Sequence, residues 1–547
     1  MDRKAAASTL RRIAGLLEIA GENRYRVRAF SSAARAVETL DGDLGEMVAS
    51  GRIVEVKGIG KGTAAVLNEL ASEVRPQVLV DVEETVPPGV RDMLKLAGLG
   101  PKKVRALWQD LGVENLGELE YACRENRLVD LKGFGPATQS SVLDAIGFFH
   151  RSRERLLIHQ AWAEAEPLIA RISSVGGVAN VTPAGELRRM GETVGELSLV
   201  AILRDGAAEG EVAAAVGEAE RIAPGQWLHR PEEGLVVRLW FASSANRGSV
   251  MLEATGSDEF LTGLGFSSAS AIEGGEEAVL RSLGCAWVPP ELRDDASWLE
   301  RARRGDLPDL CEGEAIRGVL HNHTTESDGA ATLEDMAAAA AERGWDFFGV
   351  ADHSPAAVYA NGVDAARLRD QWSRADRWND AHPGLRIVKG IEADILTDGS
   401  LDIPEGCEGG LDYVVASVHS AFRLSEEAQT ARLVAAVAHP ACRVLGHPTG
   451  RLLLARPGYA VDMERVLDAC AVHGVAVEIN ASPYRLDLDR RAARLALDRG
   501  IRLAVNPDAH SVDGLDAVRW GLAVARGAGA TASDLVNAVD IEEWLTR

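Results

Sequence analysis

The sequence has few cysteines, no long apolar run and a deficit of basic residues. Its 547 residues include only six cysteines, none of them in a CxxC pair, which indicates reduced, mostly buried thiols and no cysteine nucleophile. No uninterrupted apolar run approaches the roughly 20 residues that cross a membrane. The first residues, MDRKAAASTLRR, lack the apolar stretch of a signal peptide. We therefore expect a cytoplasmic protein with no membrane contact.

The deficit of basic residues limits how the chain can bind nucleic acid. Asp and Glu number 82 against 59 Lys and Arg, and the formal net charge is −23. This balance argues against broad electrostatic adhesion to DNA. The charges of residues 1–155 nearly cancel, so we expect any DNA contact to be local and made by this N-terminal part. The length predicts three or four domains, and we expect a monomer.

From Gly318 onward, one short apolar run after another ends in a histidine or an acid. The seven runs are GVLHNHT, FFGVADHS, RIVKGIEAD, YVVASVHS, RVLGHPTG, VAVEINASP and RLAVNPDAHS. Segments with helical periodicity, such as 333–342 and 463–473, lie between them. Strands that alternate with helices predict parallel pairing and a closed or nearly closed barrel. In such a barrel the residues just past the strand ends converge at one mouth.

The residues at these strand ends predict a centre of several metal ions. His321 and His323 are two apart on an expected strand, so their rings should face the same side. Imidazoles and carboxylates without thiolates suit manganese, zinc or iron. Because nine candidates are too many for one tetrahedral ion, we expect two or three divalent ions. The candidate ligands are His321, His323, Asp328, His353, Glu392, His419, His447, Asp508 and His510.

Three glycine turns precede helical segments in the N-terminal part. A turn of two glycines around one apolar residue directs backbone N–H groups outward at the start of a helix, where a DNA phosphate can bind. Three copies favour helix-hairpin-helix DNA binding through the backbone of the DNA, without sequence specificity. The residues concerned are Gly58, Gly60, Lys61, Gly62, Gly98, Gly100, Lys102, Lys103, Gly133 and Gly135.

The C-terminal motifs resemble the PHP (polymerase and histidinol phosphatase) family. The HxH, DH, GIE, VHS, GHP and DAH motifs stand in order from about Arg317 to the C-terminus. The resemblance implies a distorted seven-stranded barrel, a trinuclear metal site and phosphoester hydrolysis. We expect Asp352 and Glu478 to orient metal ligands. Arg451 and Arg485, in GHPTGR and SPYRLD, are expected to hold the substrate phosphate.

Four further segments resemble bacterial family X DNA polymerases with a fused PHP domain. They are GENRYRVRAF at 21–30, GELRRMGETVG at 185–195, TGS at 255–257 and PPELR at 289–293. The resemblance implies a multidomain α, α+β and α/β protein. The expected domains are a helical N-terminal DNA-binding domain at 1–85, a fingers-like helix-hairpin-helix domain at 86–155, a polymerase palm and thumb at 156–305 and the PHP barrel at 315–547.

The polymerase site departs from the family pattern. The family binds magnesium through three aspartates, and the corresponding positions here are Glu196, Ser198 and Arg238. We predict that Arg238 pairs with Glu196 in place of a metal ion. Glu186 replaces the serine that binds nucleotide phosphate, whereas Arg188 and Arg189 remain available for DNA. The palm is therefore predicted to be inactive in synthesis.

The leading interpretation is a metal-dependent phosphoesterase that acts on DNA in repair as a 3′-5′ exonuclease, with 3′-phosphatase or abasic-site endonuclease activity as a further option. One alternative is an active gap-filling polymerase and exonuclease with unusual palm ligands, which primer extension would reveal. Another is a small-molecule phosphatase of the histidinol-phosphatase type, against which the glycine turns argue. A DNA-binding scaffold is a third alternative, but a scaffold has no need of nine matched metal ligands.

Overall fold

The computed structural model describes residues 2–40, 42–72, 74–96, 98–124, 127–128, 131, 133–153, 155–231, 234–267 and 272–546. The chain forms two compact units, Met1–Arg153 and Glu154–Arg547. Within the described residues, no helix is both long enough and apolar enough to span a bilayer.

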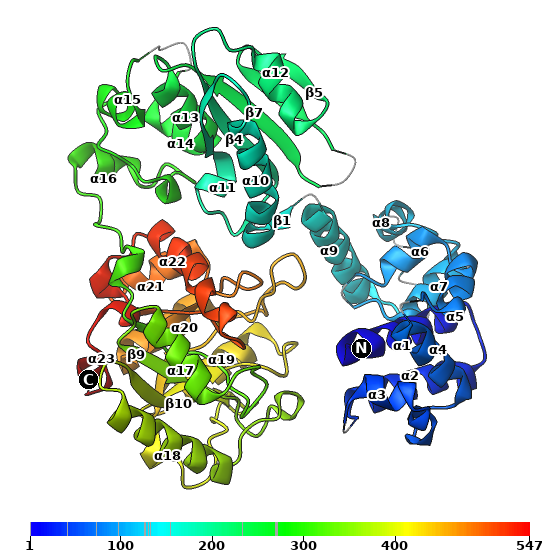
Figure 1. The fold of residues 1–547 in the computed structure, drawn as a ribbon. Helices are drawn as coiled ribbons and strands as arrows, with labels where there is room; N and C mark the ends of the chain where they lie inside the picture. Colours follow the sequence, from blue (N-terminus) through cyan, green and yellow to red (C-terminus); the bar gives the residue numbers. More distant parts are fainter. Residues whose placement is uncertain are drawn as a thin grey trace. The chain divides into compact units, whose positions relative to one another are not determined.

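The first unit is helical (Figure 1). Its apolar core includes Leu10, Ile13, Leu67 and Leu107. The helices are α1 (Arg3–Ile19), α2 (Arg24–Glu38), α3 (Leu44–Ala49), α4 (Lys61–Ala71), α5 (Gln77–Thr85), α6 (Pro88–Met93), α7 (Pro101–Leu111), α8 (Leu116–Arg124) and α9 (Pro136–Arg153).

Each of the three predicted glycine turns immediately precedes a helix, α4, α7 or α9. The first glycine of each turn has a left-handed backbone, with φ of 103° at Gly58, 84° at Gly98 and 93° at Gly133. Glycine adopts this conformation without the steric cost that a side chain brings. The second glycine, Gly60 or Gly100, is extended and caps α4 or α7. Ala97 and Lys132, which flank two of the turns, lie outside the described residues.

The second unit begins with a mixed five-stranded sheet in the order β2-β4-β7-β6-β5. Helices α10 (Ile158–Ser173) and α13 (Arg247–Thr255) pack against it, and α14 (Asp258–Leu264), α15 (Glu276–Ser282) and α16 (Leu299–Arg304) follow (Figure 1). The strands are β2 (Val178–Pro183), β4 (Glu196–Leu203), β5 (Ala219–Ala223), β6 (Gln226–His229) and β7 (Val236–Ala242). β4 and β7 are parallel, and Ser198 lies opposite Arg238.

The unit continues with a seven-stranded parallel barrel in the order β14-β13-β12-β11-β10-β9-β8. Its edges meet, because Asn322 bridges Ala509 and the Leu320 N–H donates to Asn506 Oδ1 at 2.9 Å. This nearly closed barrel confirms the predicted fold. The strands are β8 (Gly318–Val319), β9 (Phe347–Val350), β10 (Arg386–Asp394), β11 (Tyr413–Ser417), β12 (Cys442–Leu445), β13 (Ala476–Asn480) and β14 (Leu503–Asn506).

Helices connect the barrel strands, as the alternation of patterns predicts. Two of them, α17 (Leu333–Glu342) and α20 (Met463–His473), have the predicted bounds. The others are α18 (Ala365–Ala381), α19 (Glu426–Val437) and α21 (Arg490–Asp498). Between β10 and β11 the chain has only the short 3-10 helix η6 (Glu408–Gly410), and α22 (Val518–Gly527) follows the last strand. The crossover helices place every strand end on the same side of the barrel, where the polar residues of the motifs follow.

One local prediction is wrong. His321 and His323 were expected on a strand, but β8 ends at Val319 and both histidines follow it. The isolated bridge at Asn322 keeps the backbone extended there, so the two rings still lie on one side. Their ring centres are 5.2 Å apart.

Candidate metal centre

Glu392, near the end of β10, lies among four histidines. Its Oε1 is 3.2 Å from His321 Nε2, 3.2 Å from His419 Nε2 and 3.0 Å from His447 Nε2. Its Oε2 is 2.8 Å from His353 Nδ1. Four strand ends therefore bring their histidines to one carboxylate.

Two further carboxylates extend this cluster. Asp508 Oδ1 is 3.0 Å from His323 Nε2 and 3.7 Å from His321 Nε2. Asp328 Oδ1 is 3.4 Å from His510 Nε2, 3.7 Å from His353 Nε2 and 3.9 Å from His323 Nδ1. All nine predicted ligands are thus linked through Glu392, Asp508 and Asp328.

Three sets of these side chains could each hold one ion, because their ligand atoms lie within 4.8 Å of one another. The sets are His323 with Asp328, His353 and His510; His321 with His323 and Asp508; and His353 with Glu392 and His419. His323 and His353 each belong to two sets. Shared ligands of this kind suit a cluster of ions more than separate sites.

The buried donor atoms fit divalent metal ions. Within the described chain, His321 Nε2, His323 Nδ1 and Glu392 Oε2 are buried and make no well-directed hydrogen bond. Unpaired buried polar atoms are costly, and a bound cation removes that cost. Nitrogen and oxygen donors without thiolates suit manganese, zinc or iron. The centre opens to solvent at Asp328 and His510, whose side chains are 33% and 43% exposed.

Mutual charge sets the protonation of the cluster. Burial lowers the pKa of His419, but Glu392 and Asp394 outweigh burial and raise it to about 10. Burial also lowers the pKa of His510, but Asp328 and Asp508 outweigh burial and raise it to about 9. Burial and the neighbouring His353 lower the pKa of His323 to about 4. Without an ion, protons on some histidines balance the buried carboxylates.

Backbone strain occurs at two of the predicted ligands. His447 and Asp508 have φ of 24° and 53°, in the left-handed region that side chains other than glycine rarely adopt. Such strain is found where the surrounding structure holds a functional group in a required position. Each stands two residues after the end of a barrel strand, His447 after β12 and Asp508 after β14.

Glu478 and Asp352, predicted to orient ligands, contact ligand-bearing segments. Glu478 Oε1 is 2.8 Å from His321 Nδ1, and its Oε2 accepts from the His447 N–H at 2.7 Å. Asp352 accepts from the Thr324 N–H at 2.8 Å and from the Ser327 hydroxyl, so it fixes the loop between His323 and Asp328.

Several supporting residues were missed by the sequence reasoning. Asp394 Oδ1 is 2.5 Å from His419 Nδ1, and Asn480 Nδ2 donates to Asp508 Oδ2 at 3.0 Å. Asp394 and Asn480 each stand two residues after a recognised acid, Glu392 or Glu478. The strand alternation that places such residues on one face was a signal that could have identified both.

The two predicted phosphate-binding arginines differ in environment. Arg485 Nε is 3.8 Å from Asp508 Oδ2, so its guanidinium lies beside the centre. Arg451 instead donates to Glu192 Oε1 at 2.7 Å and to the Arg485 carbonyl at 2.9 Å. Its donors are engaged by the protein, which is not what the sequence led us to expect.

The polymerase positions form an internal ion pair. Arg238 Nε and Nη2 donate to Glu196 Oε1 and Oε2 at 2.7 and 2.8 Å. The Ser198 hydroxyl donates to Glu196 Oε1 at 2.9 Å. The hydrogen bond with Glu196 is the main cause that raises the pKa of Arg238. The predicted pairing of Arg238 with Glu196 is therefore present.

Two other expectations about this region need correction. Arg188 forms two hydrogen bonds with Glu276, at 2.9 and 2.6 Å, and Arg189 donates to Asp294 at 2.5 Å. Both arginines are paired within the protein. The expectation that they remain available for DNA is therefore wrong. Glu186, which replaces the phosphate-binding serine, pairs with Arg155.

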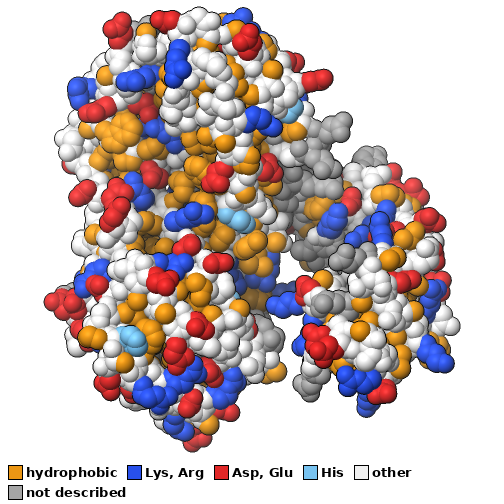
Figure 2. All heavy atoms as spheres, viewed as in Figure 1, with side chains coloured by type: hydrophobic (Ala, Val, Ile, Leu, Met, Phe, Trp, Pro, Cys, Tyr) orange, Lys and Arg blue, Asp and Glu red, His pale blue; other side chains and the backbone are white. Residues whose placement is uncertain are grey.

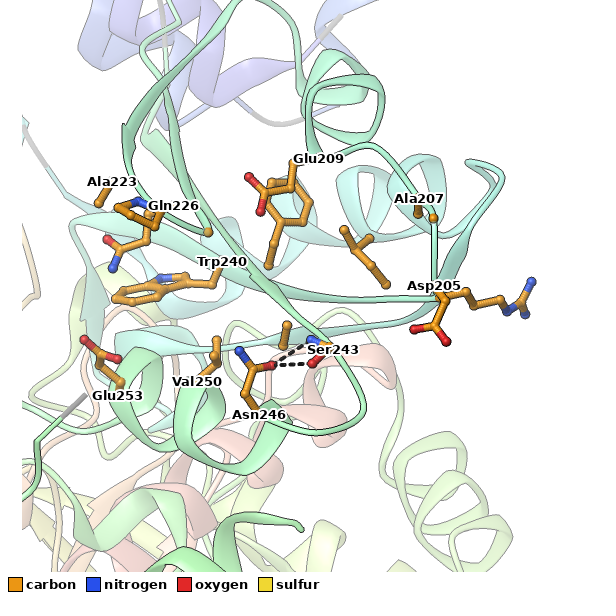
Figure 3. A pocket seen from close by; sticks show the side chains of 17 residues that line it. Asp205, Ala207, Glu209, Ala223, Gln226, Trp240, Ser243, Asn246, Val250 and Glu253 are labelled. Atoms are coloured by element: carbon orange, nitrogen blue, oxygen red, sulfur yellow. Dashed lines mark hydrogen bonds between the residues drawn. The ribbon is translucent and has the colours of Figure 1, made fainter. Parts of the chain in front are cut away.

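A cavity of about 760 Å³ lies at the other end of β4 and β7 from Glu196 (Figure 3). Figure 3 shows the Trp240 side chain between those of Gln226 and Glu253. Asp205 and Glu209 add further carboxylates to its lining. These three carboxylates outnumber Arg204, the one basic side chain among the described lining residues, and disfavour a nucleotide triphosphate, so we assign the cavity no part in nucleotide binding.

The residues of the glycine turns are mostly accessible. Gly58, Gly60, Lys61 and Lys102 are exposed, and Lys103 is partly buried, with its ammonium 5.6 Å from the centre of the Phe134 ring. Figure 2 shows acidic and basic side chains interspersed on the visible face, without a continuous basic surface. On this face, a DNA contact would depend on local groups and not on a broad basic surface.

A nearly closed parallel barrel whose mouth gathers imidazoles and carboxylates defines the class of PHP-type metal-binding proteins. Comparison with known proteins agrees: residues 320–482 match the PHP domain family, 1–75 the helix-hairpin-helix domain family and 90–147 the SAM-like helix-hairpin-helix tandem family. The chain is 32% identical to the DNA polymerase/3′-5′ exonuclease PolX of Bacillus subtilis strain 168, with 100% of both chains covered. It therefore belongs to the PolX family.

Shorter relatives match part of the chain. A probable phosphatase of Thermoanaerobacter sp. strain X514 is 31% identical over 232 residues, which are 40% of this chain and 89% of the relative. The probable phosphatase YcdX of Escherichia coli K12 is 30% identical over 204 residues, or 35% and 78% of the two chains. Divalent metal ions are implied for this fold and this set of side chains.

Proposed function

We propose that this protein is a metal-dependent phosphoesterase that acts on DNA, with 3′-5′ exonuclease activity as its main reaction and a role in DNA repair. The observation that carries the proposal is the convergence of all nine predicted ligands around Glu392, Asp508 and Asp328. The name of the Bacillus subtilis relative and its full-length match support the substrate and the direction of cleavage.

Each group of side chains at the metal centre would have its own role. The nine ligands would hold two or three ions of manganese, zinc or iron. Such ions activate water for attack on phosphorus and stabilise charge on the phosphate oxygens. Glu478, Asp352 and Asp394 would fix ligand orientation through the hydrogen bonds described above. Arg485 would attract the substrate phosphate to the centre, and no protein nucleophile is needed.

The five-stranded-sheet domain would not carry out DNA synthesis. Arg238 holds both oxygens of Glu196, and Ser198 occupies the remaining aspartate position. A magnesium ion at this site would face one carboxylate that is already neutralised and one repelling guanidinium. An active gap-filling polymerase, the alternative, has no support from this arrangement.

We also propose the predicted division into domains at 1–85, 86–155, 156–305 and 315–547. The break between compact units after Arg153 and the two separate sheets support it. The glycine turns of the first two domains would contact the DNA backbone without sequence specificity.

The direct test is incubation of the purified protein with end-labelled single-stranded, gapped and abasic DNA and manganese. We expect stepwise shortening from the 3′ end, which the double variant His321→Ala, His323→Ala should lack. Hydrolysis of small phosphomonoesters but not of DNA would favour the second candidate, a small-molecule phosphatase. That candidate has support from the two probable phosphatases that match part of the chain.

A further inference from the structure

A residue of the five-stranded-sheet domain is bonded to the rim of the barrel mouth. Glu192, in the GETVG segment before β4, accepts a hydrogen bond from Arg451 Nη2 at 2.7 Å. Arg451 also donates to the backbone carbonyls of Arg485 and Leu486. We propose that Glu192 is a positioning residue for the metal centre, which acts through Arg451 to hold Arg485 beside Asp508. This inference rests on the proposed phosphoesterase function.

Arg451 connects two loops of the rim. It stands four residues after His447 in the loop that follows β12, and its guanidinium binds the carbonyls of the loop that follows β13. The same two loops meet again where the Thr449 N–H donates to Asp487 Oδ2 at 3.0 Å. A side chain that fixes Arg451 therefore fixes both loops relative to each other.

Arg485 depends on this arrangement for its position. Its Nε lies 3.8 Å from Asp508 Oδ2, and its side chain is 21% exposed, so the guanidinium faces both the centre and solvent. The next residue, Leu486, is buried and has a φ of 43°. A left-handed leucine is unfavourable alone and persists only where its surroundings hold it. The bonds from Arg451 to the carbonyls of Arg485 and Leu486 add to the support from the Ser482 carbonyl, which accepts from the N–H groups of both residues at 2.8 and 3.0 Å.

Glu192 supplies the charge that keeps Arg451 in place. The Arg451 side chain is only 16% exposed, and Glu192 is the only acid that the described structure places in hydrogen-bond contact with it. Two other acids lie nearby: Asp489, whose Oδ2 is 3.8 Å from Arg451 Nη1, and the buried Asp487. Loss of one partner leaves the other charge uncompensated in a poorly solvated position. Without Glu192 the guanidinium would turn toward water or Asp489 and release the Arg485 carbonyl. Small displacements of a group that holds substrate reduce rates steeply.

The chain contains a matched control. Glu291 binds Arg526 Nε at 2.8 Å, and the two side chains are 13% and 16% exposed. This pair also joins the segment before the barrel to the barrel, at α22 and not at the rim loops. Glu291→Ala therefore removes an ion pair of similar burial without touching Arg451, and Arg526 keeps a second acid, Glu312, at 2.8 Å, as Arg451 keeps Asp489 nearby. If Glu192 only helped to attach this domain to the barrel, Glu192→Ala and Glu291→Ala should have the same effect on hydrolysis.

The experiment measures manganese-dependent hydrolysis of a single-stranded oligonucleotide by the full chain. We expect Glu192→Ala, and to a smaller degree Glu192→Gln, to lower kcat/KM by about tenfold, whereas Glu291→Ala stays near the parent value. In the Arg485→Ala background, Glu192→Ala should cause no further loss, because its effect passes through Arg485. Urea unfolding of each variant reports whether it is folded.

Three results would overturn the inference. The first two are equal losses in Glu192→Ala and Glu291→Ala, and losses that multiply in the double variant. An unchanged rate in Glu192→Ala with an active parent would do the same. A parent protein that hydrolyses no DNA with any metal contradicts the proposed function instead, so the two failures can be told apart.

Discussion

Arg238 and Glu196 form a two-point ion pair, with Nε and Nη2 of the arginine 2.7 and 2.8 Å from the two carboxylate oxygens. They lie on neighbouring parallel strands, β7 and β4, where Arg238 is opposite Ser198 and Glu196 stands two residues before Ser198. The guanidinium thus occupies the side of Glu196 that a magnesium ion would need. The negative charge of Glu196 is therefore balanced by Arg238, a residue of the same domain.

The first prediction concerns magnesium at this pair. Two unit charges 4 Å apart interact by about 4 kcal/mol at an effective dielectric constant near 20, and a divalent ion feels about twice the repulsion. We expect no magnesium binding at Glu196 in the parent domain. The triple variant Glu196→Asp, Ser198→Asp, Arg238→Asp should gain a magnesium site that the parent lacks, visible as an additional binding event when the two full chains are compared by calorimetric titration. A crystal soaked with magnesium and nucleotide that showed an ion at Glu196 would contradict this prediction.

A second prediction concerns Glu478, which no ion needs to touch. It is buried and lies 2.8 Å from His321 Nδ1, while its other oxygen accepts from the His447 N–H. In Glu478→Gln one of these contacts becomes unfavourable, because the amide nitrogen is a donor. Loss of such a partner commonly lowers metal affinity by about 10- to 100-fold. Competition with a chelator measures this affinity, and Glu291→Gln serves as the control. Equal affinities in both variants would exclude the role of Glu478.

The barrel and the metal ligands could both be predicted from the sequence, because the same repeated motif, an apolar run that ends in a polar residue, indicates both. Motif residues that follow apolar runs, such as His353 after β9 and His419 after β11, must meet at one mouth when the strands are parallel. Partners distant in sequence were harder to predict. Nothing in the pattern around Arg451 indicates that Glu192 binds it, because that contact depends on how two domains pack. Arg188 and Arg189 were misjudged for the same reason, since Glu276 and Asp294 lie far along the chain.

A third prediction is that metal binding releases protons. In the metal-free protein the pKa is about 10 at His419 and about 9 at His510, so both carry a proton near neutral pH. A ligating imidazole must be neutral. Binding therefore displaces these protons, and metal affinity should rise as the pH increases toward 9. Calorimetry of manganese binding at pH 7.5, in buffers with different ionisation enthalpies, counts the protons released. Heats that do not depend on the buffer would refute the assignment of these two ligands.

The last prediction concerns the glycine turns. Lys61 and Lys102 are exposed in the first turn of α4 and α7, directly after the turns that contain Gly60 and Gly100. If they contact DNA phosphates, Lys61→Ala and Lys102→Ala should each weaken binding equally for unrelated sequences and reduce the salt dependence by about one ion. Lys95→Ala is the control, because Lys95 is equally accessible but pairs with Asp92 at 2.6 Å. Fluorescence anisotropy at several salt concentrations measures all three. Should Lys95→Ala weaken binding as much as the others, general charge and not the turns would account for it.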